Sequence, residues 1–366
     1  MNYSTTLSQA SQRRRTWTPQ GTPIPGSSQV LNSAGGYSFT TTIWQQLRRF
    51  LVLGTYGGTY YISEKDLTYD NLTTVDRCIA EDPLRVLDQV LEVSDLGLAP
   101  SQDPALLVLA KLAASPDVDI RRATLDSLGR VARHSTALFH FVKFVHGIRG
   151  WGPAMRKAVA RWYFNHTPLE LAYQLTKYKQ RDDWSHRDIL RLAHPHPRLP
   201  VFDSLFAYAV RGYTGSKMTA GLPLHVAEYL RAVTDIQAQG DRDEPYLPLV
   251  TRLIRDYRLP REVLPTELLT YPDVWEALLV DMPMMAMLRN LGNMSKVGLL
   301  KPFSPAVKVV VDTFSSEVRV RGARLHPIQI LLAAKTYESG HGLRGSGTWE
   351  PVREVLDALN GAFYRS

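Results

Sequence analysis

Residues 116–129, PDVDIRRATLDSLG, carry the pattern that decides the fold class. A Pro-Asp pair is typical of a helix start, and the apolar residues that follow recur at helical spacing. The Val, Ile, Ala and Leu residues are predicted to pack inward, and the arginines are predicted to lie on the exposed side. The inward set is Val118, Ile120, Ala123, Leu125 and Leu128. This short stretch therefore predicts one amphipathic helix facing a core.

The segments around this stretch repeat its character. PLRVLDQVLEVSDLG (83–97), PALLVLAKLAAS (104–115) and VDIRRATLDSLGRVARH (118–134) each have apolar residues three and four apart, and Gly, Pro or Ser separates them. Helices then arrive every 15 to 20 residues or so, with no long strand pattern between them. The stretch at 116–129 resembles one HEAT repeat, and helical hairpins in series predict an all-α solenoid.

Length and composition bound the remaining possibilities. The chain has 366 residues, of which 44% are hydrophobic and 21% charged, as in a globular protein. The single Cys78 excludes a disulfide framework and a multi-cysteine metal site. We find no secretory signal and no apolar run of membrane-spanning length, so we expect a cytoplasmic protein. Residues 1–28 are predicted to be a disordered basic arm, and order is expected to begin near Val30.

The net charge of +8 is unevenly distributed. Residues 121–198 hold 15 Lys/Arg against 5 Asp/Glu, an excess of ten, so the rest of the chain has a net charge of −2. A basic excess confined to one segment is typical of a polyanion-binding surface. A solvated face remains the alternative for any single pair of cations.

Two helices within this segment are predicted to carry cationic faces. The first begins at Pro153 and should bury Met155, Val159 and Trp162, leaving Lys157 and Arg161 four residues apart on another face. The second begins at a capping box formed by Thr167 and Glu170. Tyr173, Lys177 and Arg181 are predicted to line one face of it at i, i+4 and i+8.

The segment 177–197, KYKQRDDWSHRDILRLAHPHP, continues this basic region. Ser185 and Asp188 predict a further capping box, with a helix from His186 to the residue before His194, and a proline stops the helix. His194 lies where a helix dipole favours the imidazolium form and could meet a phosphate. The alternative is a histidine that only caps its own helix.

Several kinds of active site are missing from the sequence. There is no phosphate-binding loop with a Walker lysine, no nucleophile elbow, no zinc-protease motif and no convincing pair of catalytic carboxylates. We therefore expect no enzyme activity, no cofactor and no metal site. A nuclease is the least favoured reading, and the methionine-rich helix near Met284 is predicted to be core.

Several blocks of the sequence together resemble the TROVE domain of the Ro autoantigen family. The segment 177–197 resembles the signature of that family, and other similar blocks follow the same order over roughly residues 30 to 366. These blocks are GGTYY (57–61), GWG with MRKA (150–158), MP with LRNLG (282–292), ARLHP (323–327), TYESGHGLRG (336–345) and AFY (362–364).

The resemblance implies a fold and a function beyond what the patterns give. It implies a closed ring of HEAT-like hairpins around a basic central hole, over residues 29–366. It also implies binding of Y RNA-like small noncoding RNAs on the outer surface and of single-stranded 3′ ends of misfolded RNAs in the hole. Polynucleotide phosphorylase, an exonuclease, is an expected partner tethered through Y RNA, and the protein is expected to be a monomer.

The resemblance also assigns candidate RNA-binding residues. Lys177, Arg181 and His194 match the family pattern, and the neighbouring cations join them as candidates. These neighbours are Arg156, Lys157, Arg161 and Arg187. The family's von Willebrand A-like domain with its metal site would begin where the sequence stops, so we expect it to be absent from this chain. The alternative function is a HEAT-type scaffold that binds acidic protein partners.

Overall fold

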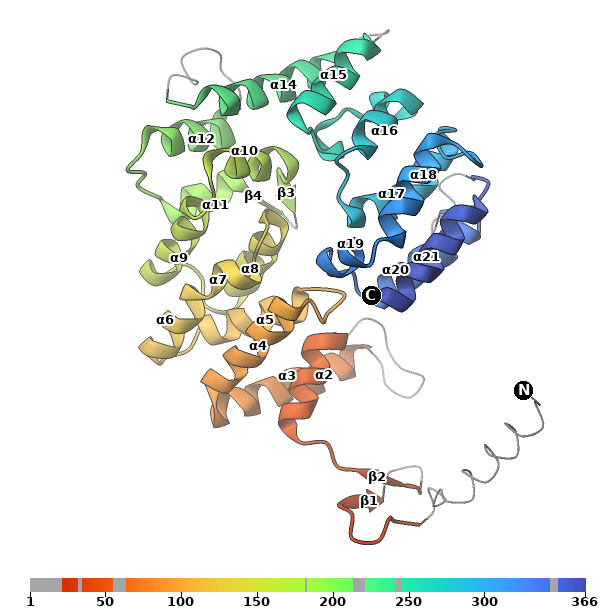
Figure 1. The fold of residues 1–366 in the computed structure, drawn as a ribbon. Helices are drawn as coiled ribbons and strands as arrows, with labels where there is room; N and C mark the ends of the chain where they lie inside the picture. The colour runs from red at the N-terminus through yellow and green to blue at the C-terminus, as the bar shows by residue number, and fades with distance from the viewer. Residues whose placement is uncertain are drawn as a thin grey trace, which may run out of the picture.

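The computed structural model describes residues 22–31, 35–54, 64–181, 183–212, 221–240, 245–342 and 348–366. Within these ranges nearly all regular structure is helical, as the periodicity predicts. The helices follow one another in chain order around a ring (Figure 1).

The first half of the ring is formed by α2 (Ile43–Leu53), α3 (Glu64–Glu81), α4 (Pro83–Leu96), α5 (Asp103–Ala113), α6 (Val118–Asp126), α7 (Leu128–Val131), α8 (Ser135–Ile148), α9 (Pro153–Phe164), α10 (Pro168–Lys177) and α11 (His186–Ala193). The second half is formed by α12 (Pro200–Arg211), α14 (Leu224–Gly240), α15 (Leu247–Tyr257), the 3-10 turns η1 (Arg261–Val263) and η2 (Thr266–Thr270), α16 (Pro272–Leu279), α17 (Met284–Lys296), α18 (Pro305–Ser315), α19 (Glu317–Gly322), α20 (Pro327–Glu338) and α21 (Arg353–Arg365).

Helix α6 shows how the HEAT-like stretch folds. Asp117 caps it by accepting hydrogen bonds from the backbone N–H groups of Asp119 and Ile120. Ile120 and Leu125 are buried as predicted. The prediction that Val118 packs inward is wrong, because Val118 is the first residue of the helix and is 63% exposed. Arg121 is not free on the surface, since its Nη1 donates to the Ser115 carbonyl at 2.8 Å.

Each helix packs mainly on helices a few positions before or after it in the chain. Helix α5 contacts α4, α6 and α8, and α10 contacts α12 and α14. Buried apolar side chains from all these helices form one continuous core. The core reading of α17 is also confirmed, because Met284, Met287 and Leu288 are buried. Contacts between neighbouring helical repeats, rather than between distant ones, are the defining property of a solenoid.

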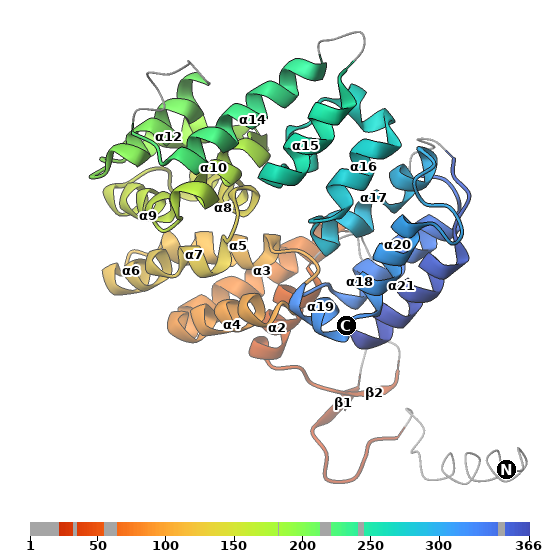
Figure 2. The same ribbon diagram turned by 45° about the horizontal axis from the view of Figure 1, so that its top comes forward.

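The two ends of the solenoid meet, which closes the ring. Gln329, in the first turn of α20, donates its Nε2–H to the carbonyl of Pro100, between α4 and α5, at 2.8 Å. The side chain of Arg324 lies against Gly97, where an added Cβ would come within 2.9 Å of Arg324 Cβ. Figures 1 and 2 both place α19 beside the first helices. The predicted solenoid and the closed ring are therefore both present.

Two short hairpins interrupt the helices. Strands β1 (Gln29–Leu31) and β2 (Tyr37–Phe39) pair antiparallel ahead of α2, so order near Val30 takes the form of a strand. Strands β3 (Gln180–Arg181) and β4 (Trp184–Ser185) pair antiparallel between α10 and α11. Of the predicted basic arm only residues 22–28 are described, and the GGTYY block lies outside the described residues.

Candidate nucleic-acid interface

Helix α9 carries two exposed cations, as its sequence predicts. It begins at Pro153 and buries Met155, Val159 and Trp162. Arg156 and Lys157 are exposed, and neither side chain forms an ion pair or hydrogen bond within the described part of the chain. Both are therefore available to an anion.

Arg161 does not complete the predicted free pair with Lys157. Its Nη1 forms an ion pair with Asp126 Oδ1 at the end of α6, and the two side chains are 41% and 49% exposed. The carboxylate lies 35 residues earlier in the sequence, so helical spacing alone could not reveal it. Arg161 joins two neighbouring helices and offers less charge to a ligand than Lys157 does.

The prediction that Tyr173, Lys177 and Arg181 share one helix face is wrong. The capping box of Thr167 and Glu170 opens α10 as predicted, but the helix ends at Lys177. Tyr178 then leaves the helical conformation at φ −118° and ψ 72°. The chain then reverses through the antiparallel strands β3 and β4. The last residue of β4, Ser185, has an extended backbone and caps the start of α11.

Lys177 is a half-buried cation held among aromatic rings. Its Nζ donates to Tyr173 Oη at 2.9 Å and lies 5.1 Å from the Tyr173 ring centroid and 5.2 Å from that of Tyr178. Burial lowers the pKa of Lys177, but the hydrogen bond to Tyr173 and the negative charges of nearby groups, Glu262 among them, outweigh it and raise the pKa. The ammonium group therefore stays charged at neutral pH.

The neighbouring His134 behaves in the opposite way. Its ring stacks on Tyr178 with centroids 5.8 Å apart, and its Nδ1 accepts the backbone N–H of Ala137 at 3.3 Å to cap α8. Burial, followed by the positive charge of Lys177, lowers the pKa of His134 to about 4. His134 is thus neutral and structural, and the local positive charge belongs to Lys177.

Arg181 lies on the β3–β4 hairpin, which Figure 1 shows on the inner side of the ring beside α10. Its register partner is Trp184, so the two side chains share one face of the hairpin. Arg181 is exposed and has no ion pair among the described residues. Asp183 turns the chain with φ 66°, a left-handed conformation that aspartate tolerates.

Helix α11 begins and ends where the sequence predicts. Ser185 and Asp188 form the capping box, and Arg187 is exposed on the helix surface. His194 caps the helix with its backbone, at φ 46° and ψ 55°, and its N–H donates to the Leu190 carbonyl. Its side chain is exposed and has no hydrogen-bond partner in the described ranges. The cap therefore uses the backbone of His194 and leaves the imidazole free.

The structure thus divides the predicted site residues into two groups. Arg156, Lys157 and Arg187 lie on α9 and α11, which pack against each other, and His194 ends α11. Lys177 and Arg181 lie beyond them, on the end of α10 and on the hairpin.

One cluster was missed by sequence reasoning. Trp151, Trp184 and His146 meet on the surface, although they come from the α8–α9 loop, from β4 and from α8. The only signal in the sequence is that aromatic residues are interleaved with the cations.

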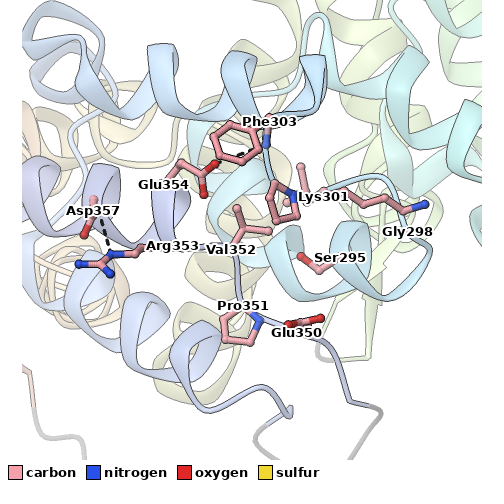
Figure 3. Close-up of a pocket in the computed structure, with 12 residues that line it drawn as sticks. Ser295, Gly298, Lys301, Phe303, Glu350, Pro351, Val352, Arg353, Glu354 and Asp357 are labelled. Carbon is pink, nitrogen blue, oxygen red and sulfur yellow. Dashed lines mark hydrogen bonds and ion pairs between the residues drawn. The ribbon is translucent and has the colours of Figure 1, made fainter.

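A separate pocket of about 650 Å³ lies between the α17–α18 loop and α21 (Figure 3). Phe303 at its edge is 92% exposed, and its backbone N–H donates to Glu354 Oε1 at 3.4 Å. Arg353 and Asp357 pair across 3.9 Å at the rim. The pocket belongs to the opposite half of the chain from the basic segment and carries both signs of charge.

The described residues contain neither a metal-binding cluster nor a helix that could span a membrane. No group of three or more His, Cys, Asp or Glu side chains there is arranged to hold a metal ion. No helix within the described ranges combines the length and apolar content needed to cross a bilayer.

Comparisons with known proteins agree with the fold and with the resemblance of the sequence. The TROVE domain model matches residues 30–220 and 258–338. The RNA-binding protein RO60 of Deinococcus radiodurans is 36% identical over 337 residues, which cover 92% of this chain and 61% of that protein. The RNA-binding protein RO60 of Caenorhabditis elegans is 32% identical, over 92% of this chain and 63% of its own length.

A solved structure extends the comparison to three dimensions. The crystal structure of the Deinococcus radiodurans RO (RSR) protein superposes with a TM-score of 0.68 at 32% identity, covering 88% of this chain and 64% of that one. The chain thus spans a little over three fifths of the length of these relatives. With a matching family model over most of its length and relatives above 30% identity, the chain belongs to the TROVE-domain family.

Proposed function

We propose that this chain is a cytoplasmic RNA-binding ring that acts in noncoding-RNA quality control and processing. It binds Y RNA-like small RNAs on its outer surface, and it accepts single-stranded 3′ ends of misfolded RNAs through its central hole. An exonuclease, polynucleotide phosphorylase in our proposal, is tethered to the monomeric ring through the Y RNA. The ring itself performs no chemistry.

The observation that carries the proposal is the set of exposed cations without carboxylate partners between residues 121 and 198. Arg156, Lys157, Arg181 and Arg187 are all exposed and have no ion pair among the described residues. A rigid scaffold that holds unpaired cations can neutralise successive phosphates and release their counterions. The names of the two RO60 relatives, both RNA-binding proteins, support the same ligand.

The proposed selectivity follows from shape rather than from base reading. Phosphate contacts position a nucleic acid without specifying its sequence. A ring opening too narrow for a duplex would admit single strands only, so RNAs with an unpaired end are preferred. Folded small RNAs remain outside, where Arg187 and His194 of α11 are the proposed contacts.

The test combines Lys177→Ala with Arg181→Ala and measures affinity for a single-stranded RNA over a range of salt concentrations. Each lost phosphate contact on a single strand reduces the slope of log K against log salt by about 0.7, so the double variant should lose about 1.4. Lys308→Ala is the control, because Lys308 is exposed on α18, outside the basic segment. It should leave both affinity and slope unchanged.

The same titration separates the two functions considered. An RNA-binding ring shows steep salt dependence and needs several linked nucleotides. A scaffold for acidic proteins would bind RNA weakly, and the double variant would then match the wild type in RNA affinity. Equal slopes for the double variant and the wild type would remove Lys177 and Arg181 from the site.

A further inference from the structure

Three aromatic side chains form a compact surface between helices α8 and α9. The ring centroids of Trp151 and Trp184 lie 6.3 Å apart at an interplanar angle of 43°. His146, in the last turn of α8, forms a T-shaped ring contact with Trp184, with centroids 5.3 Å apart and an interplanar angle of 72°. Both tryptophans are half-buried and His146 is exposed, so part of each indole reaches the surface.

The indole N–H groups set these two tryptophans apart from the other four that the structure describes. Each of those four donates its Nε1–H to a protein oxygen, namely Trp44 to Glu81, Trp162 to Ala132, Trp275 to Leu269 and Trp349 to Tyr337. Trp151 and Trp184 donate to no protein group within the described residues, and neither nitrogen is buried. Buried indoles usually find an internal partner, so a free N–H at the surface leaves this pair open to a ligand.

The cation of Arg181 lies next to this aromatic surface. Arg181 is the cross-strand partner of Trp184 on the β3–β4 hairpin, and directly opposed residues have Cβ atoms about 5 Å apart on one face. The hairpin packs on α8, so Arg181, Trp184 and His146 lie on elements that contact one another. An exposed guanidinium next to partly exposed aromatic rings matches one nucleotide, whose base stacks while its phosphate pairs with the cation.

We propose that Trp151 and Trp184, with His146 at their edge, form a stacking site for one unpaired nucleobase whose phosphate is bound by Arg181. The inference rests on the proposed RNA-binding function and deepens it. Bases inside a duplex already stack on each other, so only an unpaired base can reach these rings. The site therefore adds a preference for unpaired nucleotides that does not depend on the width of the ring opening.

The test uses two probes with equal charge. One is a fluorescein-labelled decaadenylate, and the other is an abasic ribose-phosphate chain of the same length. Trp184→Leu should weaken decaadenylate binding about tenfold, equivalent to about 1.4 kcal/mol, because stacking is lost. It should leave affinity for the abasic chain and the salt slope for both probes unchanged. Trp184→Phe, which keeps an aromatic face, should restore most of the lost affinity.

Controls separate stacking from folding. Tyr364→Leu removes an aromatic ring that is 84% exposed on α21, far along the chain from the cluster, and should bind both probes like the wild type. Thermal unfolding followed by circular dichroism checks that each variant is folded. Trp151→Leu repeats the test from the α9 side if Trp184→Leu unfolds the hairpin.

Three outcomes decide the matter. If the wild type binds neither probe, the proposed RNA-binding function fails. If the wild type binds both but Trp184→Leu and Trp151→Leu keep their preference for decaadenylate, the stacking site is wrong while RNA binding stands. If a folded variant weakens both probes equally, the tryptophans only position Arg181, and the stacking proposal is again overturned.

Discussion

At the scale of single residues, His194 has a structural backbone and a side chain that is free to bind a ligand. Its backbone ends α11 in the left-handed region, at φ 46°, while its imidazole is exposed. Glycine adopts that conformation without a Cβ penalty. A glycine at position 194 would therefore keep the helix cap and remove only the imidazole.

We predict that His194→Gly keeps the fold and leaves the stability unchanged or up to about 1 kcal/mol higher. Affinity for a small structured Y RNA-like RNA should fall, while affinity for a single strand should not. Chemical denaturation and RNA titration on the same sample measure both quantities. Undiminished binding of the structured RNA by the glycine variant would mean that His194 is only a cap.

The surroundings of Lys177 could be predicted only in part from the sequence. Sequence spacing correctly marks it as a cation near Tyr173, and the two are hydrogen-bonded. A second ring beside it belongs to Tyr178, the residue after the helix, and Tyr178 in turn stacks on His134 at the start of α8. No local pattern could have placed His134 there, because that contact depends on how two helices pack.

At the scale of elements, starts and ends of helices were the most predictable features. The boxes at Thr167 and Ser185 involve residues three positions apart, so the sequence contains all the information they need. The end of α10 was missed because no Gly or Pro marks it. The hairpin that follows is favoured by the turn residue Asp183 and by the extended cap at Ser185.

The Asp126–Arg161 ion pair is a contact between two helices that the sequence of neither helix predicts. It joins α6 to α9 and is partly exposed, so its contribution to stability is at most about 1 kcal/mol. Its larger effect in our proposal is on charge, because the carboxylate occupies a guanidinium that would otherwise face the ligand.

We predict that Asp126→Asn raises RNA affinity and steepens the slope of log K against log salt by about 0.7 for a single strand, because Arg161 is released. Glu92→Gln is the matched control, since it releases Arg48 from a similarly exposed pair on α2 and α4, outside the basic segment. That control should leave the slope unchanged. A slope that is equally unaffected in Asp126→Asn would exclude Arg161 from the RNA surface.

At the scale of the whole molecule, the contact between Gln329 and Pro100 closes the ring. Local sequence patterns could not predict this contact. The solenoid follows from repeated amphipathic helices, but the curvature that brings Gln329 to Pro100 accumulates over every hairpin between them. Only the resemblance to a family implied a closed ring, and the contacts at Gly97 and Pro100 explain how it closes here.

We predict that Gly97→Ala destabilises the protein by about 1 to 3 kcal/mol, because φ is +65° there and the new Cβ would press on Arg324. Hydrogen exchange should rise at residues 93–102 and at 324–330 and stay unchanged in α14 and α15. Gly129→Ala serves as the control, since its Cβ would meet nothing within 4 Å. Faster exchange at 93–102 without any change at 324–330 would show that the two segments are not coupled.

The closing hydrogen bond joins residues 229 positions apart in the chain, and this separation has a consequence for synthesis. At ~5–20 residues per second, Gln329 leaves the ribosome on the order of 10 to 50 s after Pro100. During that interval the growing protein is an open arc, and a strand without a free end could be enclosed as the arc completes. If RNA strands occupy the central hole, as we propose, a strand must thread into the closed ring by its end. Linear RNA should then outcompete circular RNA for the finished protein but not for the nascent one.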